Sequence, residues 1–271
     1  MSTEQDLRDR IVSVKKTQKM TGAMKMVAAA KFKQVTKTRT KLQAYLDLSH
    51  ALIQTASGNQ SELQWFKPAS SPVRWVIIMT GDRGLCGGFN SILLKKAVST
   101  VQKSDDQVYG VGLKSKAFKS TDLTPLAWGG TPESLPVIRN FVDGFLDQYE
   151  SGQVGKLVVI RQAFVSAIRS DITVDTLMPL VPATSTVDLE YSPSEPVVVR
   201  DLVKTYISTH LYNSVIETKA GEEAARMQAM TAATSNAGEM ISDLELAYNR
   251  ARQATITTEL TEIVAGAEAL N

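Results

Sequence analysis

The sequence contains only one cysteine, Cys86, among its 271 residues. An intramolecular disulfide is therefore impossible, and nothing in the chain demands an oxidising compartment. No uncharged apolar run approaches the roughly 18 residues that a membrane-spanning helix needs. The net charge of +2 argues neither for a nucleic-acid binder nor for an acidic protein. Hydrophobic content of 43% and charged content of 21% are ordinary for a globular protein.

The first ten residues, MSTEQDLRDR, also lack the marks of a targeting segment. They carry three acids and no apolar core. Transit peptides are poor in acids, and secretory signals need an apolar region. We therefore expect neither kind of leader.

Proline is absent from both ends of the chain. All nine prolines lie between Pro68 and Pro196. Because proline costs about 3 kcal/mol inside a helix, proline-free stretches of this length are helix candidates. The composition predicts an N-terminal helix over 1–67, a central unit over 68–196 and a C-terminal helix over 197–271.

Heptad spacing supports both helices and predicts that they pair through an apolar seam. The C-terminal seam consists of Met227, Met230, Thr234, Ala237, Ile241, Leu244 and Tyr248 and, after a one-residue phase shift, Ile256, Leu260, Ile263, Ala267 and Leu270. The N-terminal stripe consists of Leu7, Ile11, Val14 and Gln18, continued out of phase by Met20, Met24 and Val27. We expect a long antiparallel two-helix coiled coil.

The charges of the two helices favour this pairing. Residues 8–41 hold eleven bases and one acid, whereas residues 200–271 hold ten acids and six bases. Exposed ion pairs contribute only about 0–1 kcal/mol each, so the apolar seam supplies most of the stability. A helix of roughly 70 residues is on the order of 105 Å long, so we expect most of the pair to extend beyond the central unit.

The central unit alternates strands and helices. Apolar runs over 73–80, 107–113 and 156–166 are typical of buried strands, and 171–182 is typical of an edge strand. Amphipathic helices are expected over 89–103 and 134–150. This alternation predicts a three-layer, Rossmann-like α/β unit.

The stretch TGDRGLCGGFN, residues 80–90, lies where a nucleotide-binding loop would lie. The P-loop pattern needs Lys-Ser/Thr after its last glycine, but Phe89 and Asn90 follow Gly88 here, and the Rossmann glycine spacing is also absent. We therefore interpret the glycines as a tight turn and Cys86 as a small turn residue. His50 and His210 have no metal-like spacing, although a Ser–His–Asp array stays open.

The basic N-terminal helix has three interpretations: a phosphate-backbone binder, a solvated face beside the acidic helix, or a contact for acidic groups of a partner protein. Little aromatic interleaving favours the last two. With no visible active site, the residues alone indicate an interaction protein. The rivals are an α/β enzyme with a coiled-coil arm and a static adaptor between two complexes.

Three stretches carry a resemblance to a known family: RIVSVKKTQKMTGAMKMVAAAKF at 10–32, DRGLCGGFN at 82–90, and residues 223–270. Over its whole length the sequence resembles the γ subunit of F-type ATP synthases, the central rotor shaft. The resemblance implies a non-catalytic subunit without a cofactor, metal or nucleic acid. Its rotation, driven by ion flow, would force the catalytic β subunits through successive conformations.

The resemblance also implies partners and a location. They are the hexamer of alternating α and β subunits, the ε subunit (δ in mitochondria) and the ring of c subunits, through which the chain would meet the membrane indirectly. The location would be the cytoplasmic face of a bacterial inner membrane or the matrix face of the mitochondrial one. No long insertion with a cysteine pair is present, which disfavours the redox-regulated chloroplast form.

Site residues follow from the matching motifs. The predicted contacts with the β subunit are Arg252, Gln253, Thr257, Glu259, Met24, Arg83 and Cys86. Tyr206 matches a position at the foot, near the c ring or ε. The small and β-branched residues near the C-terminus would give a slim surface that favours no angle, since equal affinity for all states shifts none of them.

Overall fold

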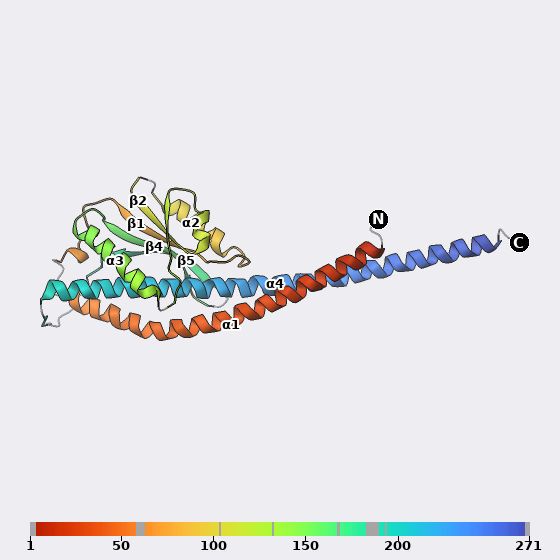
Figure 1. Cartoon of the computed structure of the whole chain (residues 1–271), viewed down its shortest axis with the longest axis horizontal. Helices are drawn as coiled ribbons and strands as arrows, with labels where there is room; N and C mark the ends of the chain where they lie inside the picture. The colour runs from red at the N-terminus through yellow and green to blue at the C-terminus, as the bar shows by residue number, and fades with distance from the viewer. Residues whose placement is uncertain are drawn as a thin grey trace. The chain divides into compact units, whose positions relative to one another are not determined.

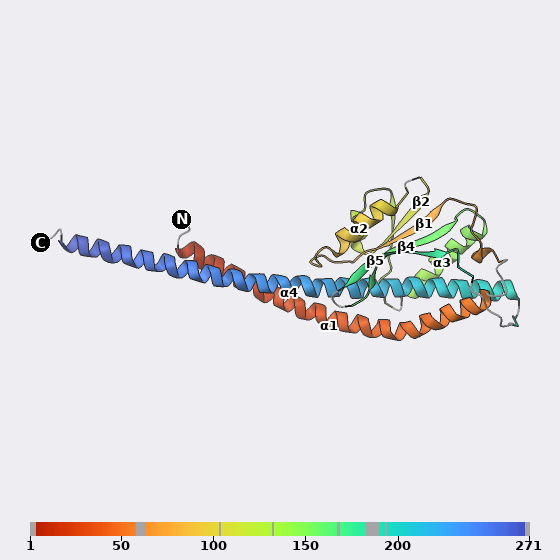
Figure 2. The ribbon, with the colours of Figure 1, turned by 180° about the vertical axis from the view of Figure 1, so that it is seen from behind.

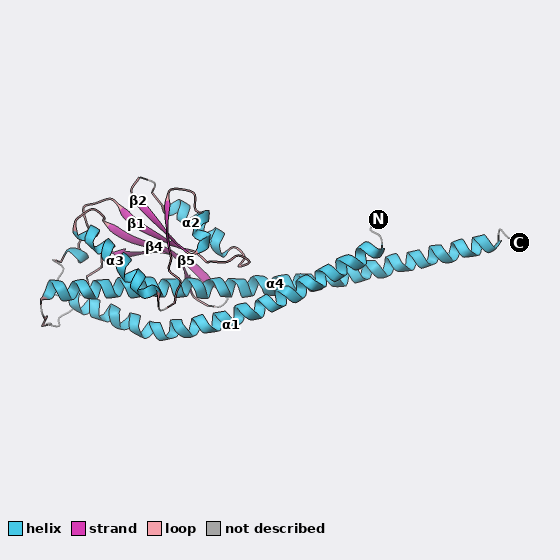
Figure 3. Cartoon of the chain, in the orientation of Figure 1, coloured by secondary structure: helices cyan, strands magenta, loops and turns pink. Residues whose placement is uncertain are grey.

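The computed structural model describes residues 4–57, 63–102, 104–131, 133–166, 169–182, 190–192 and 194–268. Along the chain, one long helix precedes and another follows a smaller α/β region (Figure 3). The helices are α1 (Glu4–Ser57), α2 (Phe89–Thr100), α3 (Ser134–Glu150) and α4 (Glu195–Glu268), with short 3₁₀ helices η1 (Gln64–Phe66) and η2 (Leu113–Ala117). The strands are β1 (Arg74–Met79), β2 (Asp106–Val111), β3 (Leu123–Leu126), β4 (Lys156–Phe164) and β5 (Ser170–Met178).

Residue contacts divide the chain into two units. One holds the chain up to Ala28 and from Met227 onward, and the other holds Ala29–Arg226. Helices α1 and α4 each run through both units without a break, which confirms the helices expected from the proline-free ends. The predicted domain boundaries at 67 and 196 both fall within the second unit, and the predicted division stays a prediction.

The first unit is an antiparallel helix pair. Lys15 Nζ lies 2.7 Å from Glu245 Oε1, and the Thr234 hydroxyl donates to the Thr21 hydroxyl at 2.8 Å. The partner number falls as the α1 number rises, so the helices run in opposite directions. The Lys15–Glu245 pair is half-exposed and contributes little, so packing holds the unit together.

The seam of this pair confirms the predicted α4 residues. Met230, Ala237 and Ile241 are buried, and Leu244 and Tyr248 are partly buried. The predicted continuation at Ile256, Leu260 and Ile263 is exposed instead. Leu270 lies outside the described residues.

On α1 the predicted phase shift after Gln18 is wrong. Met20 and Val27 are exposed, whereas Thr21 and Ala28 are buried and continue the heptad of Leu7 and Ile11 without a break. The physical reason is that Thr21 satisfies its hydroxyl by donating to the Gln18 carbonyl at 3.0 Å, and it also accepts from Thr234. A small polar residue, Thr21, therefore occupies the seam position that a search for apolar residues assigns to Met20.

The second unit contains a five-stranded sheet in the order β3-β2-β1-β4-β5. The four strands β1 to β4 are parallel, and β5 is an antiparallel edge strand. The four predicted strands and both predicted helices of the central unit are confirmed. Strand β3 was missed because Pro125 lies within its four residues, and proline is tolerated only at a sheet edge such as this one.

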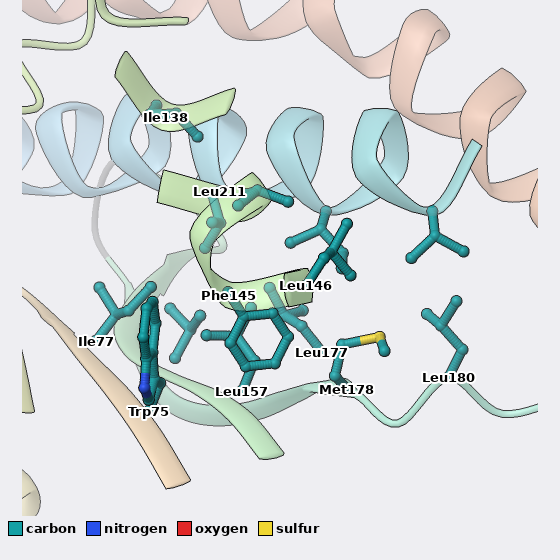
Figure 4. Packing of buried hydrophobic residues seen from close by; sticks show 14 of the residues in the cluster. Trp75, Ile77, Ile138, Phe145, Leu146, Leu157, Leu177, Met178, Leu180 and Leu211 are labelled. Atoms are coloured by element: carbon teal, nitrogen blue, oxygen red, sulfur yellow. The ribbon is translucent and has the colours of Figure 1, made fainter. Parts of the chain in front are cut away.

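Apolar residues on the two faces of the sheet form two separate cores. Val76 and Ile78 of β1 pack with Leu93 and Ala97 of α2. The alternate residues Trp75 and Ile77 face the larger core, which Figure 4 shows with Phe145, Leu146 and Leu211 of α3 and α4. The three layers are therefore α2, the sheet, and α3 with α4, as predicted.

Within this unit, α4 lies along the sheet, and α1 runs beside α4 (Figures 1 and 2). Val199, Val203, Ile207 and Leu211 of α4 are fully buried in the larger core. A helix stretch that is buried on several sides is expected to be apolar around much of its circumference, and the buried hydroxyls of Ser214 and Thr218 donate to carbonyls of their own helix.

We predict that Ile241→Ala lowers the free energy of unfolding of the free chain by about 2 kcal/mol, because it removes a buried seam side chain and leaves a cavity. Urea denaturation followed by circular dichroism would measure the loss. Ile256→Ala on the same helix is the matched control, since Ile256 is 43% exposed, and its effect should stay within about 0.5 kcal/mol. Equal losses for the two variants would contradict the assigned seam.

Candidate functional site

The glycine-rich loop between β1 and α2, residues 80–88, contains two residues in the left-handed backbone conformation. Leu85 has φ of 61° and Gly87 has φ of 57°. Glycine adopts the left-handed conformation freely, but a leucine there costs about 1–2 kcal/mol. The surroundings of the loop must therefore offset this strain.

A carboxylate from α4 holds the loop. The backbone amides of Asp82 and Arg83 donate to Glu222 at 3.0 and 3.1 Å. A Cβ on Gly81 would lie 2.6 Å from Cδ of Glu222, so glycine is required for this close approach. The Asp82 side chain in turn accepts from the Leu113 amide at 3.1 Å, which ties the loop to η2.

Arg226 completes the arrangement one helical turn further along α4. Its guanidinium pairs with Glu222, lies 2.7 Å from Glu223 Oε2, and donates through Nε to the Gly84 carbonyl at 3.3 Å. Glu222 and Arg226 are both buried, so each needs the other to offset the loss of water. Burial lowers the pKa of Arg226, but the hydrogen bonds that its guanidinium donates to Glu222 and Glu223 outweigh this effect, and the pKa is raised. We call Glu222 and Arg226 the clamp.

The clamp explains the glycines without a nucleotide. A phosphate site needs free backbone amides at the loop, but the Asp82 and Arg83 amides already donate to a carboxylate of the same chain. The structure thus favours the tight turn over the phosphate loop. The clamp was not predicted from the sequence, because an i,i+4 Glu–Arg pair is usually found on a solvated helix face. The neighbouring glycine loop was the only available signal.

Of the two predicted loop contacts, Arg83 is exposed and Cys86 is buried. The Cys86 thiol donates to the Arg83 carbonyl at 3.6 Å and accepts from Asn90 at 3.3 Å. Burial, and then the charge of Glu222, raise the pKa of this thiol, so it is not a reactive thiolate. Any contact of this loop with a partner would pass through its neighbours.

A hollow of about 460 Å³ lies beside the loop, between α1 and α4. Val35, Tyr212 and Ile216 give it an apolar floor, and Lys31 and Arg83 lie on its rim. The described residues provide neither of these two bases with an ion-pair partner. The hollow therefore combines apolar surface with charges of both signs, since Asp82, Glu222 and Glu223 also line it.

Tyr206, the predicted foot contact, is partly buried and joins two histidines that are far apart in sequence. Its ring centroid lies 5.9 Å from that of His50 on α1 and 6.1 Å from that of His210 on α4. Contacts between aromatic rings, and not a Ser–His–Asp array, bring the two histidines together. Burial raises the pKa of Tyr206.

Buried ion pairs adjoin this ring cluster. Glu217 accepts from Arg39 of α1 at 3.0 Å and from Arg161 of β4, which also donates to Asp175 of β5 at 2.7 Å. The network therefore links α1, α4 and two strands. Single removal of a member of such a network costs about 3–5 kcal/mol, because it leaves a buried charge without its partner.

The remaining predicted contacts lie in the first unit. Met24 is partly buried, whereas Arg252, Gln253, Thr257 and Glu259 are exposed on α4. In this stretch of α4 each threonine hydroxyl donates to a carbonyl of its own helix four residues earlier. These bonds join Thr255 to Ala251, Thr257 to Gln253, Thr258 to Ala254 and Thr261 to Thr257, at 2.8–3.1 Å.

Comparison with known proteins decides the family. A family model described as ATP synthase matches residues 3–270. The ATP synthase gamma chain of Glaesserella parasuis serovar 5 is 35% identical over 292 residues, which cover 100% of both chains. The chain belongs to the ATP synthase γ chain family. The gamma chain of Chlorobaculum tepidum is 34% identical over 100% of this chain and 99% of its own.

Solved structures show the same fold. A chain of the Euglena gracilis mitochondrial ATP synthase, from a structure of its OSCP, F1 and c-ring, has a TM-score of 0.67 at 18% identity, covering 98% of this chain and 94% of that one. A chain of the Tetrahymena thermophila central stalk and c-ring has a TM-score of 0.62 at 22% identity, covering 79% of this chain and 99% of that one. The predicted fold class is thereby confirmed.

Membership confirms the function expected from the resemblance. A γ chain is the central shaft of the F1 complex, a rotor subunit that serves ATP synthesis without a catalytic site of its own. The α/β enzyme considered as a rival is thus excluded. Within the described part of this γ chain, no helix is long and apolar enough to cross a membrane. No group of three metal-ligating side chains is found there either.

We predict that the free chain loses stability as the pH falls below about 6.5, the ordinary pKa of histidine, because the pKa of His210 is lowered. Burial is the main cause, followed by Arg161, while Asp175 and Glu217 oppose it and His50 adds a small effect. The unfolded chain therefore binds more protons than the folded one between the two pKa values, so stability is full above 6.5 and is lost below it.

Urea midpoints measured from pH 7.5 to 5 would check this prediction. His210→Gln should flatten the dependence, while His50→Gln, which removes only the smallest influence, should keep most of it. A wild-type slope unchanged by His210→Gln would show that other groups are responsible.

Proposed function

We propose that the chain turns inside a ring of three α and three β subunits and couples rotation of a c ring to successive conformational changes of the β subunits. The observation that carries this proposal is the uncovered apolar part of α4. Ile256, Leu260, Ile263 and Val264 are 43–68% exposed, and the described residues of the chain provide them with no cover. Large exposed apolar surfaces mark sites of protein association.

The contacts proposed with the β subunits lie on both units. On α4 they are Arg252, Gln253, Thr257 and Glu259, on α1 Met24, and on the loop Arg83 directly and the buried Cys86 through its neighbours. The Arg252 guanidinium suits a bidentate contact with a carboxylate, which a lysine would replace poorly. The exposure of Arg252 and Gln253 without side-chain partners among the described residues supports their availability to another chain.

A further contact is proposed in the second unit. Tyr206 lies in the second unit and is our candidate for the region that meets the ε subunit (δ in mitochondria) or the c ring. Through that ring the chain would meet an energy-transducing membrane indirectly. Its place would be peripheral, at the cytoplasmic face of a bacterial inner membrane or the matrix face of the mitochondrial one.

The energetics of ion transport explain why a stiff shaft is needed. One charge that crosses 100 mV yields about 2.3 kcal/mol, so several crossings must be combined for each ATP. The shaft carries the torque between these steps. Two helices joined by a seam resist twisting better than one, and asymmetric contacts let each angle favour a different β conformation.

Observation of single assembled complexes tests the proposal. A bead attached to this chain in an immobilised complex should turn in one direction when ATP is supplied. A complex that hydrolyses ATP while the bead stays fixed would favour a static adaptor and contradict the proposed rotation.

We predict that Arg252→Ala and Gln253→Ala each lower the ATPase rate of the assembled complex several-fold, because each removes a hydrogen-bonded contact worth roughly 1–2 kcal/mol. Steady-state turnover of purified complexes would measure the loss. Arg250→Ala is the matched control, since Arg250 is also an exposed arginine but lies about 200° around the helix from Arg252. Full activity of both test variants would remove these residues from the contact surface.

A further inference from the structure

The tip of the glycine-rich loop exposes an apolar side chain in an unfavourable backbone conformation. Leu85 is 59% exposed and has φ of 61°. Arg83, two residues earlier, is also exposed and has no ion-pair partner among the described residues. Solvent favours neither the exposed leucine nor its strained backbone, so a role in contact with another molecule is the natural explanation.

The clamp determines this conformation because its bonds fall on the three residues before the tip. Glu222 accepts from the amides of Asp82 and Arg83, and Arg226 donates to the carbonyl of Gly84. The next residue is Leu85. With backbone groups of three successive residues bonded to α4, the direction in which the tip leaves the helix is fixed as well.

We propose that Glu222 is a positioning residue for contact with the catalytic ring. It holds the loop on α4, with the help of Arg226, so that Leu85 and Arg83 meet an apolar spot beside a carboxylate on a β subunit. The inference rests on the proposed function and adds to it Leu85, a contact residue that the sequence motif did not single out, and the clamp that presents it.

The chemistry of the clamp requires an anion at position 222. Two amide donors and one guanidinium converge on the same carboxylate, whose two oxygens both accept. Glutamine places an NH₂ donor where one of these oxygens lies, so an amide or the guanidinium loses its acceptor. The buried site makes that loss costly.

Cys86 gives a direct reading of the loop. It is the only cysteine of the chain, and it is a buried residue of the loop, with 3% of its surface exposed. In the full chain labelled with N-ethylmaleimide, Glu222→Gln should raise the rate of Cys86 alkylation about tenfold or more, because the loop opens locally more often. Peptide mass spectrometry would quantify the rate, with hydrogen exchange at the Asp82 and Arg83 amides as a second measure.

Glu223→Gln is the matched control. Glu223 is the next residue on α4 and also pairs with Arg226, but the hydrogen bonds from the loop amides go to Glu222. This control should leave both loop measures near the wild-type values. In assembled complexes Glu222→Gln should lower ATPase turnover several-fold with little change in KM for ATP, since the nucleotide sites are elsewhere, while Glu223→Gln should keep turnover near wild type.

Two further variants separate positioning from folding. Gly81→Ala should push the Glu222 carboxylate away and reproduce the effect of Glu222→Gln, and the double variant should be no worse than either single one. Leu85→Asn keeps a residue that tolerates the left-handed conformation but removes the apolar tip. It should leave Cys86 protected and still lower turnover.

Unchanged Cys86 alkylation in Glu222→Gln would overturn the clamp. A loosened loop with full ATPase turnover, or full turnover in Leu85→Asn, would overturn its role in the contact. Failure of the proposed function would look different from failure of this inference. In that case even the complex with the wild-type chain would show no ATP-driven turning.

Discussion

The burial of α4 is the constraint on which the other features of this γ chain depend. Between Val199 and Ala220 the helix is buried in the α/β unit, and from Met230 to Ile241 it shares a heptad seam with α1. Beyond Ala251 its apolar residues are exposed as far as the burial of the side chains is described. One uninterrupted helix thus meets three environments, and its composition changes to suit each one.

Buried charges fix how α4 sits within the second unit. Apolar packing alone tolerates a shift of a helix along its axis, since one leucine resembles another. Glu217 and Glu222 do not permit such a shift, because one must meet Arg39 and Arg161 and the other must meet the loop amides. Buried pairs of this kind add little net stability, but a wrong register leaves charges unpaired. A shaft that transmits torque benefits from the second property.

Much of the fold follows from the sequence because its strongest signals are periodic. The proline-free ends gave two helices, the heptad gave the α4 seam, and apolar runs gave four of the five strands. Strand β3 was not predicted, because it is short and contains Pro125. Thr21 was not predicted as a seam residue, because its hydroxyl bonds to Gln18 and Thr234 only in the folded helix pair. The clamp was not predicted for a related reason, since the burial of Glu222 depends on a loop that lies 140 residues away in the sequence. Exposed contact residues such as Arg252 have no physical signature of their own, and only the family resemblance singles them out.

The threonine hydroxyls near the end of α4 have a consequence for contact with other chains. Thr255, Thr257, Thr258 and Thr261 donate their hydroxyl hydrogens to carbonyls of their own helix, so these hydrogens are not available to a neighbouring chain. At any angle around the helix axis, this stretch therefore offers few hydroxyl donors.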